Sequence, residues 1–529
     1  MRLVEYLDKG ASLAPDAPCL TTDGETLTYA DVQQLSYRIA GALAATGVRP
    51  GGKVAILSAN DPVAFACVFG ISRAGAVWCP INPRNEAAEN RELLDQFDCE
   101  VLIYQAAFAP LVDRIRDSLP KIHTFVCLDG AAPDPQTSGL TPHPAGRRTV
   151  GWDAFCGGAS QPAPDLTSPD DLAMIVGTGG TTGRPKGVML SNGNLEAMTA
   201  LTLMGYPFGE RPVYLALAPL THAAGVLCFP VLASGGEIVI MRAPDVHAFL
   251  ELIPRHRVTH TFLPPTLIYM VLAAPELDAT DLSSLRCFWY GAAPMSVARL
   301  EEALQRIGPV MAQLFGQTEA PMMISMLPPA AHFDAFGNIA RDRLSSAGRP
   351  APLVTVAIMG ADGTLLPHGE RGEIVVRGSL VMKGYYRNAE ATAAASAYGW
   401  HHTGDIGYLD DENYLYIVDR AKDMIITGGF NVYSTEVEQA LMAHAAVQDC
   451  AVIGLPDEKW GERVVAVVQL QPGASADAGE LIAFAKARIG SVKAPKEVLV
   501  WPDLPRSKVG KVVKPDIKAR LSVAPDPTP

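Results

Sequence analysis

The chain has 529 residues, and a single hydrophobic core seldom grows that large, so we expect two or more domains. Its formal net charge of −13 and its pI near 5.4 argue against a basic nucleic-acid or membrane surface as the main working surface, because such surfaces need clustered Lys and Arg. An anionic substrate therefore has to meet a local cluster of positive charge.

The nine cysteines are scattered and form no CxxC pair, so they indicate neither a zinc site nor a disulfide framework. The first residues lack the basic start and the apolar run of a secretory signal, and no apolar stretch reaches the roughly 18 residues that would span a bilayer. We therefore expect a cytoplasmic protein.

The first unit in chain order is a βαβ pattern. Residues 53–80 read KVAILSANDPVAFACVFGISRAGAVWCP, in which a β-rich run, a helix-period stretch and a second β-rich run follow one another. This pattern predicts an α/β domain with a mostly parallel sheet. Residues 129–169 are rich in Pro, Gly, Ser and Ala with little periodicity, which predicts a long surface excursion without a core element.

The most informative segment is GTGGTTGRPKGV at residues 177–188. The apolar run LAMIV precedes it and the strand-like VML continues from it, so we expect a strand on each side of a loop rich in glycine and threonine. Backbone N–H groups and hydroxyls in such a loop can approach a polyphosphate closely. It is not a Walker A loop, because Arg and Pro stand between Gly183 and Lys186, whereas that motif places Gly and Lys nearly side by side.

A second change of composition comes near Asp419, where the strand-like YLYIV ends in the charged run DRAKD. Another β-rich and helix-period series continues to about Leu521. We expect one domain at residues 1–420 and a second, within the usual size range of a domain, at residues 421–529. The final APDPTP is expected to be a disordered tail.

Six ordered motifs together resemble those of the adenylate-forming (AMP-binding) superfamily, which includes acyl-CoA synthetases, aryl-CoA ligases, peptide-synthetase adenylation domains and firefly luciferase. Besides the loop at residues 177–188 they are YGAAPMS from Tyr290, QLFGQTE from Gln313, WHHTGDIG from Trp400, DRAKDMIITGGFNVYSTEVE from Asp419 and LPRSKVGKVVK from Leu504. The resemblance implies a large N-terminal α/β domain of sheets packed with helices. A hinge would join it to a small mobile α+β domain that carries the catalytic lysine.

The resemblance also implies ATP, Mg²⁺ and coenzyme A. Glu319 would hold Mg²⁺, a hard cation that favours carboxylate oxygen shared with substrate phosphates. Asp405 would accept the ribose hydroxyls, and Lys511 would contact the α-phosphate during adenylation. The implied catalytic residues are Lys511, Glu319, Thr318, Arg420 and His222. The implied ATP and AMP contacts are Thr178, Gly179, Gly180, Thr181, Thr182, Gly183, Lys186, Gly291, Ala292, Ala293, Gln313, Phe315, Gly316, Thr318, Asp405, Arg420 and Lys511.

The resemblance assigns the acid and the thiol to other residues. The implied acyl pocket consists of His222, Ala292, Gly316, Gln317, Pro321 and Met322. Its small and apolar residues favour an uncharged tail, hence a medium-chain fatty, alicyclic or aromatic acid over acetate, malonate or an amino acid. Gly428 and Gly429 would line the coenzyme A channel without a side chain to block the pantetheine arm. Lys422 would be the hinge.

Each residue also has a plainer interpretation. Asp405 is in isolation a turn cap, with His401 and His402 shaping the turn before it. Phe315 is equally a core aromatic. The run PRSKVGKVVK is in isolation a basic surface patch. The resemblance implies instead that Lys511 is catalytic and that Lys508 and Lys514 are bystanders.

The implied function is an ATP-dependent carboxylic acid:coenzyme A ligase, with the acid, ATP and coenzyme A as small-molecule partners, no nucleic acid and no transmembrane segment. A stand-alone enzyme that loads an acyl group on a carrier protein stays open, as does a catalytically silent adenylate-binding protein. The joint retention of Glu319, Asp405, Arg420 and Lys511 speaks against the silent protein. A peptide-synthetase domain would carry an Asp where this chain has LTHAAGV. A homodimer also stays open.

Overall fold

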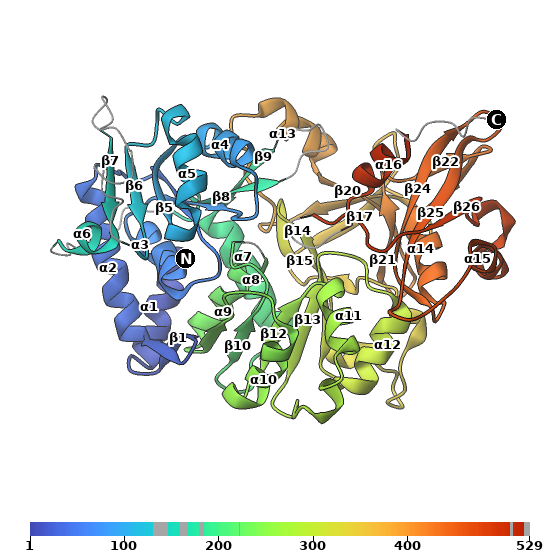
Figure 1. The fold of residues 1–529 in the computed structure, drawn as a ribbon, viewed down its shortest axis with the longest axis horizontal. Coiled ribbons are helices and arrows are strands. Elements are labelled where there is room, and N and C mark those ends of the chain that lie inside the picture. Colours follow the sequence, from blue (N-terminus) through green and yellow to red (C-terminus); the bar gives the residue numbers. More distant parts are fainter. Residues whose placement is uncertain (131–146, 159–167, 179–184, 222, 508–511, 523–529) are drawn as a thin grey trace.

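The computed structural model describes residues 1–130, 147–158, 168–178, 185–221, 223–507 and 512–522. Two large sheets with parallel centres dominate its N-terminal part (Figure 1). The predicted βαβ unit is confirmed, since Lys53 lies opposite Val77 in parallel strands joined by a helix. The helix begins where the Asp61 side chain accepts hydrogen bonds from the next backbone N–H groups, with Pro62 at its first position.

The sheet that contains this unit has eight strands. Its centre is parallel, and its edge near the glycine-rich loop is antiparallel. In order across the sheet, the strands are β19 (Gly384–Tyr385), β9 (Lys186–Ser191), β8 (Leu172–Thr178), β4 (Val77–Ile81), β3 (Lys53–Leu57), β5 (Cys99–Tyr104), β6 (Thr124–Cys127) and β7 (Arg148–Gly151).

The second sheet has nine strands and is parallel from β1 to β14, with antiparallel strands at both edges. In order, they are β16 (Arg349–Pro350), β15 (Ala320–Leu327), β14 (Met311–Gln317), β13 (Cys287–Gly291), β12 (His260–Leu263), β10 (Val213–Ala216), β11 (Glu237–Ile240), β1 (Pro18–Thr22) and β2 (Glu25–Thr28).

Helices cover both faces of each sheet, so the strands are apolar on both sides. Val54 and Ile56 belong to the core between the two sheets, whereas Ala55 and Leu57 face an outer core. The helices of the central core are α1 (Leu3–Leu13), α2 (Tyr29–Ala45), α3 (Pro62–Arg73), α7 (Asn192–Gly205) and α9 (Cys228–Ala233). The outer helices are α4 (Ala87–Gln96) and α5 (Ala109–Ile115) on one side and α10 (Val246–His256), α11 (Pro265–Ala273) and α12 (Val297–Arg306) on the other.

The segment at residues 129–169 is not wholly an excursion. Within its described residues, β7 pairs in parallel with β6 and leads into α6 (Trp152–Cys156), whose Phe155 and Cys156 are buried in the central core. The prediction of no core element was wrong because one short edge strand and one helical turn give too few residues for a periodic signal.

A third and a fourth sheet complete the chain, and the last one carries its own cores. In the last sheet, Val464, Ala466 and Val468 face one side while Val465 and Val467 face the other. The third sheet consists of β17 (Thr355–Met359), β18 (Gly372–Arg377), β20 (His401–Leu409) and β21 (Leu415–Arg420), with α13 (Ala389–Ala395) before β20. The fourth consists of β23 (Phe430–Val432), β22 (Ile425–Thr427), β25 (Gly461–Leu470), β24 (Val447–Asp457) and β26 (Glu497–Val500), with α14 (Ser434–Met442), α15 (Ala478–Lys493) and α16 (Lys514–Ser522).

The predicted fold class, a large α/β part followed by a smaller α+β part, is confirmed. The third sheet ends at Arg420 and the fourth begins at Ile425, on either side of the predicted hinge residue Lys422. The limits of the domains stay a prediction. The predicted disordered tail lies outside the described residues.

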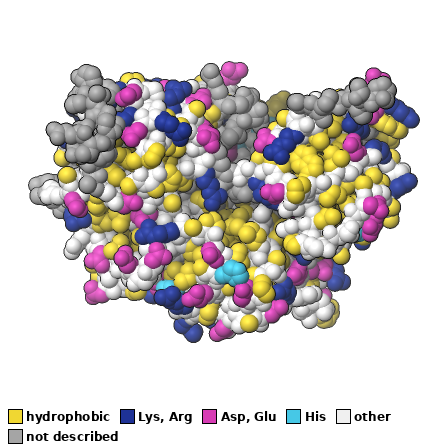
Figure 2. Space-filling model, in the orientation of Figure 1, with side chains coloured by type: hydrophobic (Ala, Val, Ile, Leu, Met, Phe, Trp, Pro, Cys, Tyr) yellow, Lys and Arg dark blue, Asp and Glu magenta, His cyan; other side chains and the backbone are white. Residues whose placement is uncertain are grey.

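The surface agrees with the acidic composition. On the face drawn in Figure 2, the Lys and Arg side chains are scattered among Asp and Glu side chains. Within the described residues, none of the helices combines the length and the apolar character needed to cross a bilayer.

Candidate active site

Glu319 lies in the tight connection between β14 and β15. Gln317 pairs with Ala320 across this hairpin, so Thr318 and Glu319 form the turn. Just before the turn, a Cβ added to Gly316 would lie 2.5 Å from the backbone nitrogen of Met322, whose φ of 64° is left-handed. Glycine is the residue that permits this close approach, which fixes the direction in which the turn projects Glu319.

A tyrosine from a distant part of the chain holds the Glu319 carboxylate. The Tyr385 hydroxyl donates to Glu319 Oε1 at 2.8 Å, and the Met382 backbone N–H donates to the Glu319 carbonyl at 2.7 Å. Burial raises the pKa of Tyr385, and the Glu319 carboxylate raises it further, so the phenol is protonated at neutral pH. Sequence reasoning missed Tyr385, although it lies in the sequence KGYYRN between the two motifs at Gln313 and Trp400.

Lys186 approaches the same tyrosine from the base of the glycine-rich loop. The confirmed strands β8 and β9 meet at the pair Thr178 and Lys186, and the Lys186 Nζ lies 4.9 Å from the centroid of the Tyr385 ring. This is within the range of a cation–π contact. The structure thus brings Lys186, Tyr385 and Glu319 together, so that a cation and a carboxylate flank one aromatic side chain.

The chemistry of Glu319 fits Mg²⁺. Among the described residues there is no group of three or more His, Cys, Asp or Glu side chains that could hold a metal ion by itself. Mg²⁺ is commonly bound by one or two carboxylates together with substrate phosphates, and it keeps several of its waters. A single carboxylate near Lys186, at the end of the loop predicted to bind phosphates, meets that requirement.

Asp405 and Arg420 lie directly opposite one another in β20 and β21. Arg420 Nε lies 3.0 Å from Asp405 Oδ1, and the two side chains are 52% and 6% exposed, respectively. The guanidinium is thus accessible, while the carboxylate is buried. An interface with a ribose and its phosphate fits this pair, because hydroxyls donate to a carboxylate and phosphates accept from a guanidinium.

The prediction of a turn around Asp405 was wrong. Residues 401–409 form a strand in which alternate residues are buried, and His401 and His402 belong to it. Gly404 has a left-handed φ of 72°, and the pairing with β21 shifts between Ile406 and Gly407. The two glycines therefore permit an irregularity in the strand pairing, and the chain does not reverse its direction there.

Gln317 joins this strand to the Glu319 hairpin. Its Nε2 donates to the Thr403 carbonyl at 3.2 Å, and its Oε1 lies 3.3 Å from His401 Nε2. Burial lowers the pKa of His401, with Glu319 acting in the opposite direction, so the imidazole is neutral at pH 7 and can donate to the amide oxygen. The predicted pocket residue Gln317 therefore also fixes the geometry between two motifs.

The predicted adenine-site residues gather at the carboxyl ends of β13 and β14. A Cβ on Gly291 would lie 2.3 Å from the Leu314 carbonyl oxygen, and Ala292 has a left-handed φ of 65°. The Gln313 side-chain oxygen is buried with no hydrogen-bond partner among the described residues, and Phe315 is partly exposed. This edge of a parallel sheet is where ligands bind in open α/β folds. Ala293 follows in the same loop, and the predicted pocket residues Pro321 and Met322 are buried at the start of β15.

Asn60, which sequence reasoning missed, holds the segment that leads to His222. Its Oδ1 accepts from the Leu220 N–H at 2.9 Å, and its Nδ2 donates to the carbonyls of Ala218 at 3.2 Å and Met241 at 3.1 Å. One side chain from the loop after β3 thereby joins the two large sheets. Its sequence signal was weak, because an Asn before a helix cap is common in loops.

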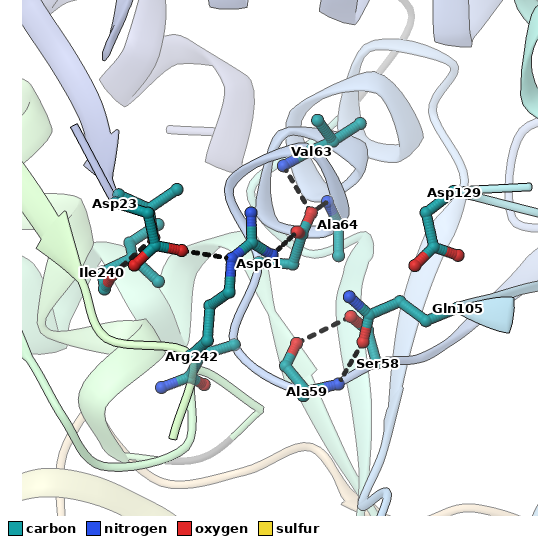
Figure 3. Close-up of polar contacts among 12 residues, drawn as sticks. Asp23, Ser58, Ala59, Asp61, Val63, Ala64, Gln105, Asp129, Ile240 and Arg242 are labelled. Carbon is teal, nitrogen blue, oxygen red and sulfur yellow. Dashed lines mark hydrogen bonds and ion pairs between the residues drawn. The ribbon is translucent and has the colours of Figure 1, made fainter. Parts of the chain in front are cut away.

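Figure 3 shows how the loop on either side of Asn60 is itself fixed. Gln105 Oε1 accepts from the Ala59 N–H at 2.9 Å. On the other side, Arg242 contacts Asp61, and its Nε lies 2.8 Å from Asp23 Oδ2. The Asn60 amide is therefore presented from a loop anchored at both ends.

In the C-terminal part, Gly428 and Gly429 form the turn of the β22–β23 hairpin, with φ of 57° and 81°. Two successive left-handed residues are what a tight hairpin turn of this kind needs. A Cβ on Gly428 would lie 2.9 Å from the Trp460 ring, whereas a Cβ on Gly429 would meet nothing within 4 Å. In the arrangement of Figure 1, β22 lies at the far side of the C-terminal part from β14.

Lys514 is not part of a basic surface patch. Its Nζ lies 2.8 Å from Glu438 Oε1 and also contacts the Ser434 hydroxyl, which donates to Asp419 Oδ1 at 2.9 Å. Burial alone would lower the pKa of Lys514, but Glu438 and Asp419 together raise it. Because Asp419 precedes the predicted hinge and the other three residues follow it, this buried cluster spans the connection. Lys514 therefore has a structural role at this connection, and its standing as a bystander to the chemistry stays a prediction.

Several predicted residues lie outside the described part of the chain. They are Gly179, Gly180, Thr181, Thr182 and Gly183 of the glycine-rich loop, the pocket residue His222, Lys508, and Lys511. Their roles stay predictions.

Comparisons with known proteins extend over nearly the whole chain. A family model described as AMP-binding enzyme matches residues 7–386, and one described as AMP-binding enzyme C-terminal domain matches residues 436–511. The chain is 36% identical to a feruloyl-CoA synthase of an Amycolatopsis species, covering 97% of both chains. It is 35% identical to a medium/long-chain-fatty-acid–CoA ligase of Mycobacterium tuberculosis, covering 92% of this chain and 85% of the relative. The structure of an amide bond synthetase from Marinactinospora thermotolerans is similar with a TM-score of 0.85 and 30% identity, covering 99% of this chain and 100% of that one.

Proposed function

Because the chain belongs to the AMP-binding enzyme family, we infer that it is an ATP-dependent carboxylic acid:coenzyme A ligase, which forms an acyl-adenylate and then an acyl thioester. The observation that carries this is the spatial convergence of the Lys186 end of the phosphate loop with Glu319, in a chain that matches a coenzyme A ligase along 97% of its length. The retention of the Asp405–Arg420 pair supports it.

The first half-reaction joins a poor nucleophile to a shielded electrophile. An acid carboxylate oxygen attacks the α-phosphorus of ATP, and the bond to pyrophosphate breaks. The enzyme must neutralise charge and hold the reacting atoms in line. Mg²⁺ supplies charge neutralisation when bound. Glu319 would hold it, Lys186 and the loop would face the phosphates, and Asp405 would hold the ribose while Arg420 reaches a ribose or phosphate oxygen.

In the second half-reaction a thiol sulfur attacks the acyl carbon and AMP leaves. By family resemblance, Lys511 serves the first step and then turns away by rotation about Lys422, and the Gly428–Gly429 turn serves the second. The solvent-exposed tip at Gly429 in this structure leaves that turn accessible, which supports its proposed role in admitting a pantetheine arm.

We propose an acid with an uncharged apolar tail, of the medium-chain fatty, alicyclic or aromatic classes. The buried, apolar start of β15 at Pro321, Met322 and Met323 supports this, as do relatives named for ferulate and for fatty acids. The free and buried cysteines support a reducing compartment such as the cytoplasm.

A screen of acid-dependent AMP release tests both the class and the acceptor. Purified protein is given ATP, Mg²⁺ and one acid at a time, with coenzyme A, a phosphopantetheinyl carrier protein or a simple amine as acceptor. We expect thioester with coenzyme A and an apolar acid. Exclusive use of an amino acid or a dicarboxylate would overturn the proposed acid class, and exclusive transfer to the carrier protein or the amine would overturn the acceptor. Absence of AMP release with every acid would indicate a silent adenylate-binding protein.

A further inference from the structure

Tyr385 contacts two groups that the proposed function assigns to ATP and its metal. Its hydroxyl lies 2.8 Å from Glu319 Oε1, and its ring centroid lies 4.9 Å from the Lys186 Nζ. The three residues come from separate parts of the chain and meet through this one side chain. The tyrosine itself is 9% exposed. A hydroxyl in such a place makes a strong charge-assisted hydrogen bond to a carboxylate.

The backbone around Tyr385 is fixed independently of these contacts. Tyr385 pairs with Val188 of β9, and its N–H donates to Thr392 Oγ1 of α13 at 2.9 Å. The preceding Gly384 has a φ of 134°, and a Cβ there would lie 2.7 Å from Thr392 Cγ2. The helix thus packs directly on the backbone that carries the tyrosine, so the point from which the ring projects is fixed.

We propose that Tyr385 is a positioning residue for the metal and the phosphates, which orients the Glu319 carboxylate through its hydroxyl and the Lys186 ammonium through its ring. With Oε1 engaged by the phenol, Oε2 would be left to hold the metal. The second charge, Lys186, lies against the ring of the same tyrosine, at the end of the glycine-rich loop. The inference rests on the proposed function and deepens it.

The neighbouring tyrosine provides a matched control. Tyr386 donates its hydroxyl to Asp98 Oδ2 at 2.6 Å, and its ring packs against a different core. Tyr385→Phe and Tyr386→Phe each remove one hydroxyl bound to a carboxylate and leave the ring in place. Tyr385→Leu also removes the aromatic contact with Lys186.

The direct measurement is Mn²⁺ binding in the presence of α,β-methylene-ATP, followed by the electron paramagnetic resonance signal of free Mn²⁺. Loss of a group that orients a metal ligand typically weakens metal affinity by about ten- to a hundredfold. We expect Y385F to weaken Mn²⁺ binding about tenfold, and Y385L to weaken binding of the nucleotide as well. Y386F is expected to bind like the wild type, and circular dichroism and melting temperatures check that all variants fold.

A double-mutant cycle separates positioning from a general loss of structure. If Tyr385 acts through Glu319, the Y385F substitution should add little to the loss of Mn²⁺ affinity already caused by Glu319→Gln. Equal losses in both backgrounds, or wild-type Mn²⁺ affinity in folded Y385F, would overturn the inference. Failure of the proposed function would appear elsewhere, as a wild-type protein that forms no adenylate with any acid.

Discussion

At the scale of single residues, Glu319 is the carboxylate on which adenylation should depend most. Glu319→Gln keeps the size of the side chain and an oxygen that can accept from Tyr385, but it removes the charge that is proposed to hold the metal. Losing one such contact to developing charge typically costs about 3 kcal/mol, or roughly a hundredfold in rate. ATP–pyrophosphate exchange measures this step. Glu390→Gln, in the exposed first turn of α13, is the control. Full exchange activity in excess chelator would refute the metal role.

Lys514 should matter for stability rather than for chemistry. Removing one partner of a buried ion pair leaves the other charge without compensation, which typically costs about 3–5 kcal/mol. We therefore expect Lys514→Met to lower the free energy of unfolding by about 3 kcal/mol, because Glu438, whose side chain is 18% exposed, would lose its partner. Lys518→Met is the control, because Lys518 is 47% exposed and 3.7 Å from its partner Glu462. Equal stability of the two variants in urea denaturation would contradict this account.

The same lysine predicts a pH dependence. Because the pKa of Lys514 is raised in the folded state, its contribution to stability is complete below the unfolded value of about 10.4 and is lost as the pH rises through the higher folded value. Denaturation curves from pH 8 to 11.5 should therefore show a steeper alkaline loss of stability in the wild type than in K514M. If the stabilities of the wild type and K514M fell in parallel with rising pH, the pKa of Lys514 would not differ between the folded and the unfolded state.

The sequence was informative about residues whose chemistry is local and silent about those whose role depends on distant contacts. Glu319, Asp405 and Arg420 stand in motifs with recognisable neighbours, and the structure places the last two side by side. Tyr385 and Asn60 act on residues far from them in the chain, so no spacing could indicate them. Lys514 stands in a dense cationic run, and charge density does not reveal burial.

At the scale of elements, periodic segments were predicted well and irregular ones were not. The βαβ unit at β3, α3 and β4 has enough residues for both periodicities to be visible. The strand β20 was mistaken for a turn because Gly404 and Gly407 are usually turn residues. The strand β7 was missed because it has only four residues and joins the sheet at its edge.

The β22–β23 hairpin should separate folding from thioester formation. Asn tolerates a left-handed backbone, so Gly429→Asn should keep the turn while placing a side chain where the pantetheine arm is proposed to pass. We expect thioester release from preformed acyl-adenylate to fall at least tenfold, on the order of the loss seen when bound groups are misplaced. Pyrophosphate exchange should stay near the wild-type rate.

Gly473→Asn is the matched control for this element. Gly473 has a φ of 78° and, like Gly429, no atom within 4 Å of an added Cβ, but it lies between β25 and α15. If both substitutions lower thioester release equally, backbone strain rather than obstruction explains the effect.

At the scale of the whole molecule, the two half-reactions should be separable by two substitutions in the C-terminal part. Lys511→Ala should nearly abolish pyrophosphate exchange and leave thioester formation from synthetic acyl-adenylate largely intact, because its charge is proposed to serve only the attack on the α-phosphorus. Gly429→Leu should do the reverse. Equal damage to both half-reactions in both folded variants would exclude an alternation of the C-terminal part between two states.

The distribution of thiols over the molecule gives another expectation. All nine cysteines are free and buried. Burial raises the pKa of Cys67, Cys228 and Cys287, which further suppresses the reactive thiolate. Ellman's reagent should therefore react only slowly with the native protein. In guanidinium, which unfolds the chain, it should react with all nine thiols. Rapid reaction of one thiol in the native protein would show that the structure around that cysteine opens to solvent.

Because the native thiols are buried, introduced surface cysteines can be labelled with fluorescent dyes for single-molecule measurements without first replacing the native cysteines. Ser12 lies at the exposed end of α1 and Ser475 in the exposed segment before α15, so Ser→Cys at both positions would place one dye on each side of the predicted hinge. The interdye distance would then report rotation of the C-terminal part during turnover. Dwell times in each distance state could be compared with the rates of the two half-reactions in the same molecules.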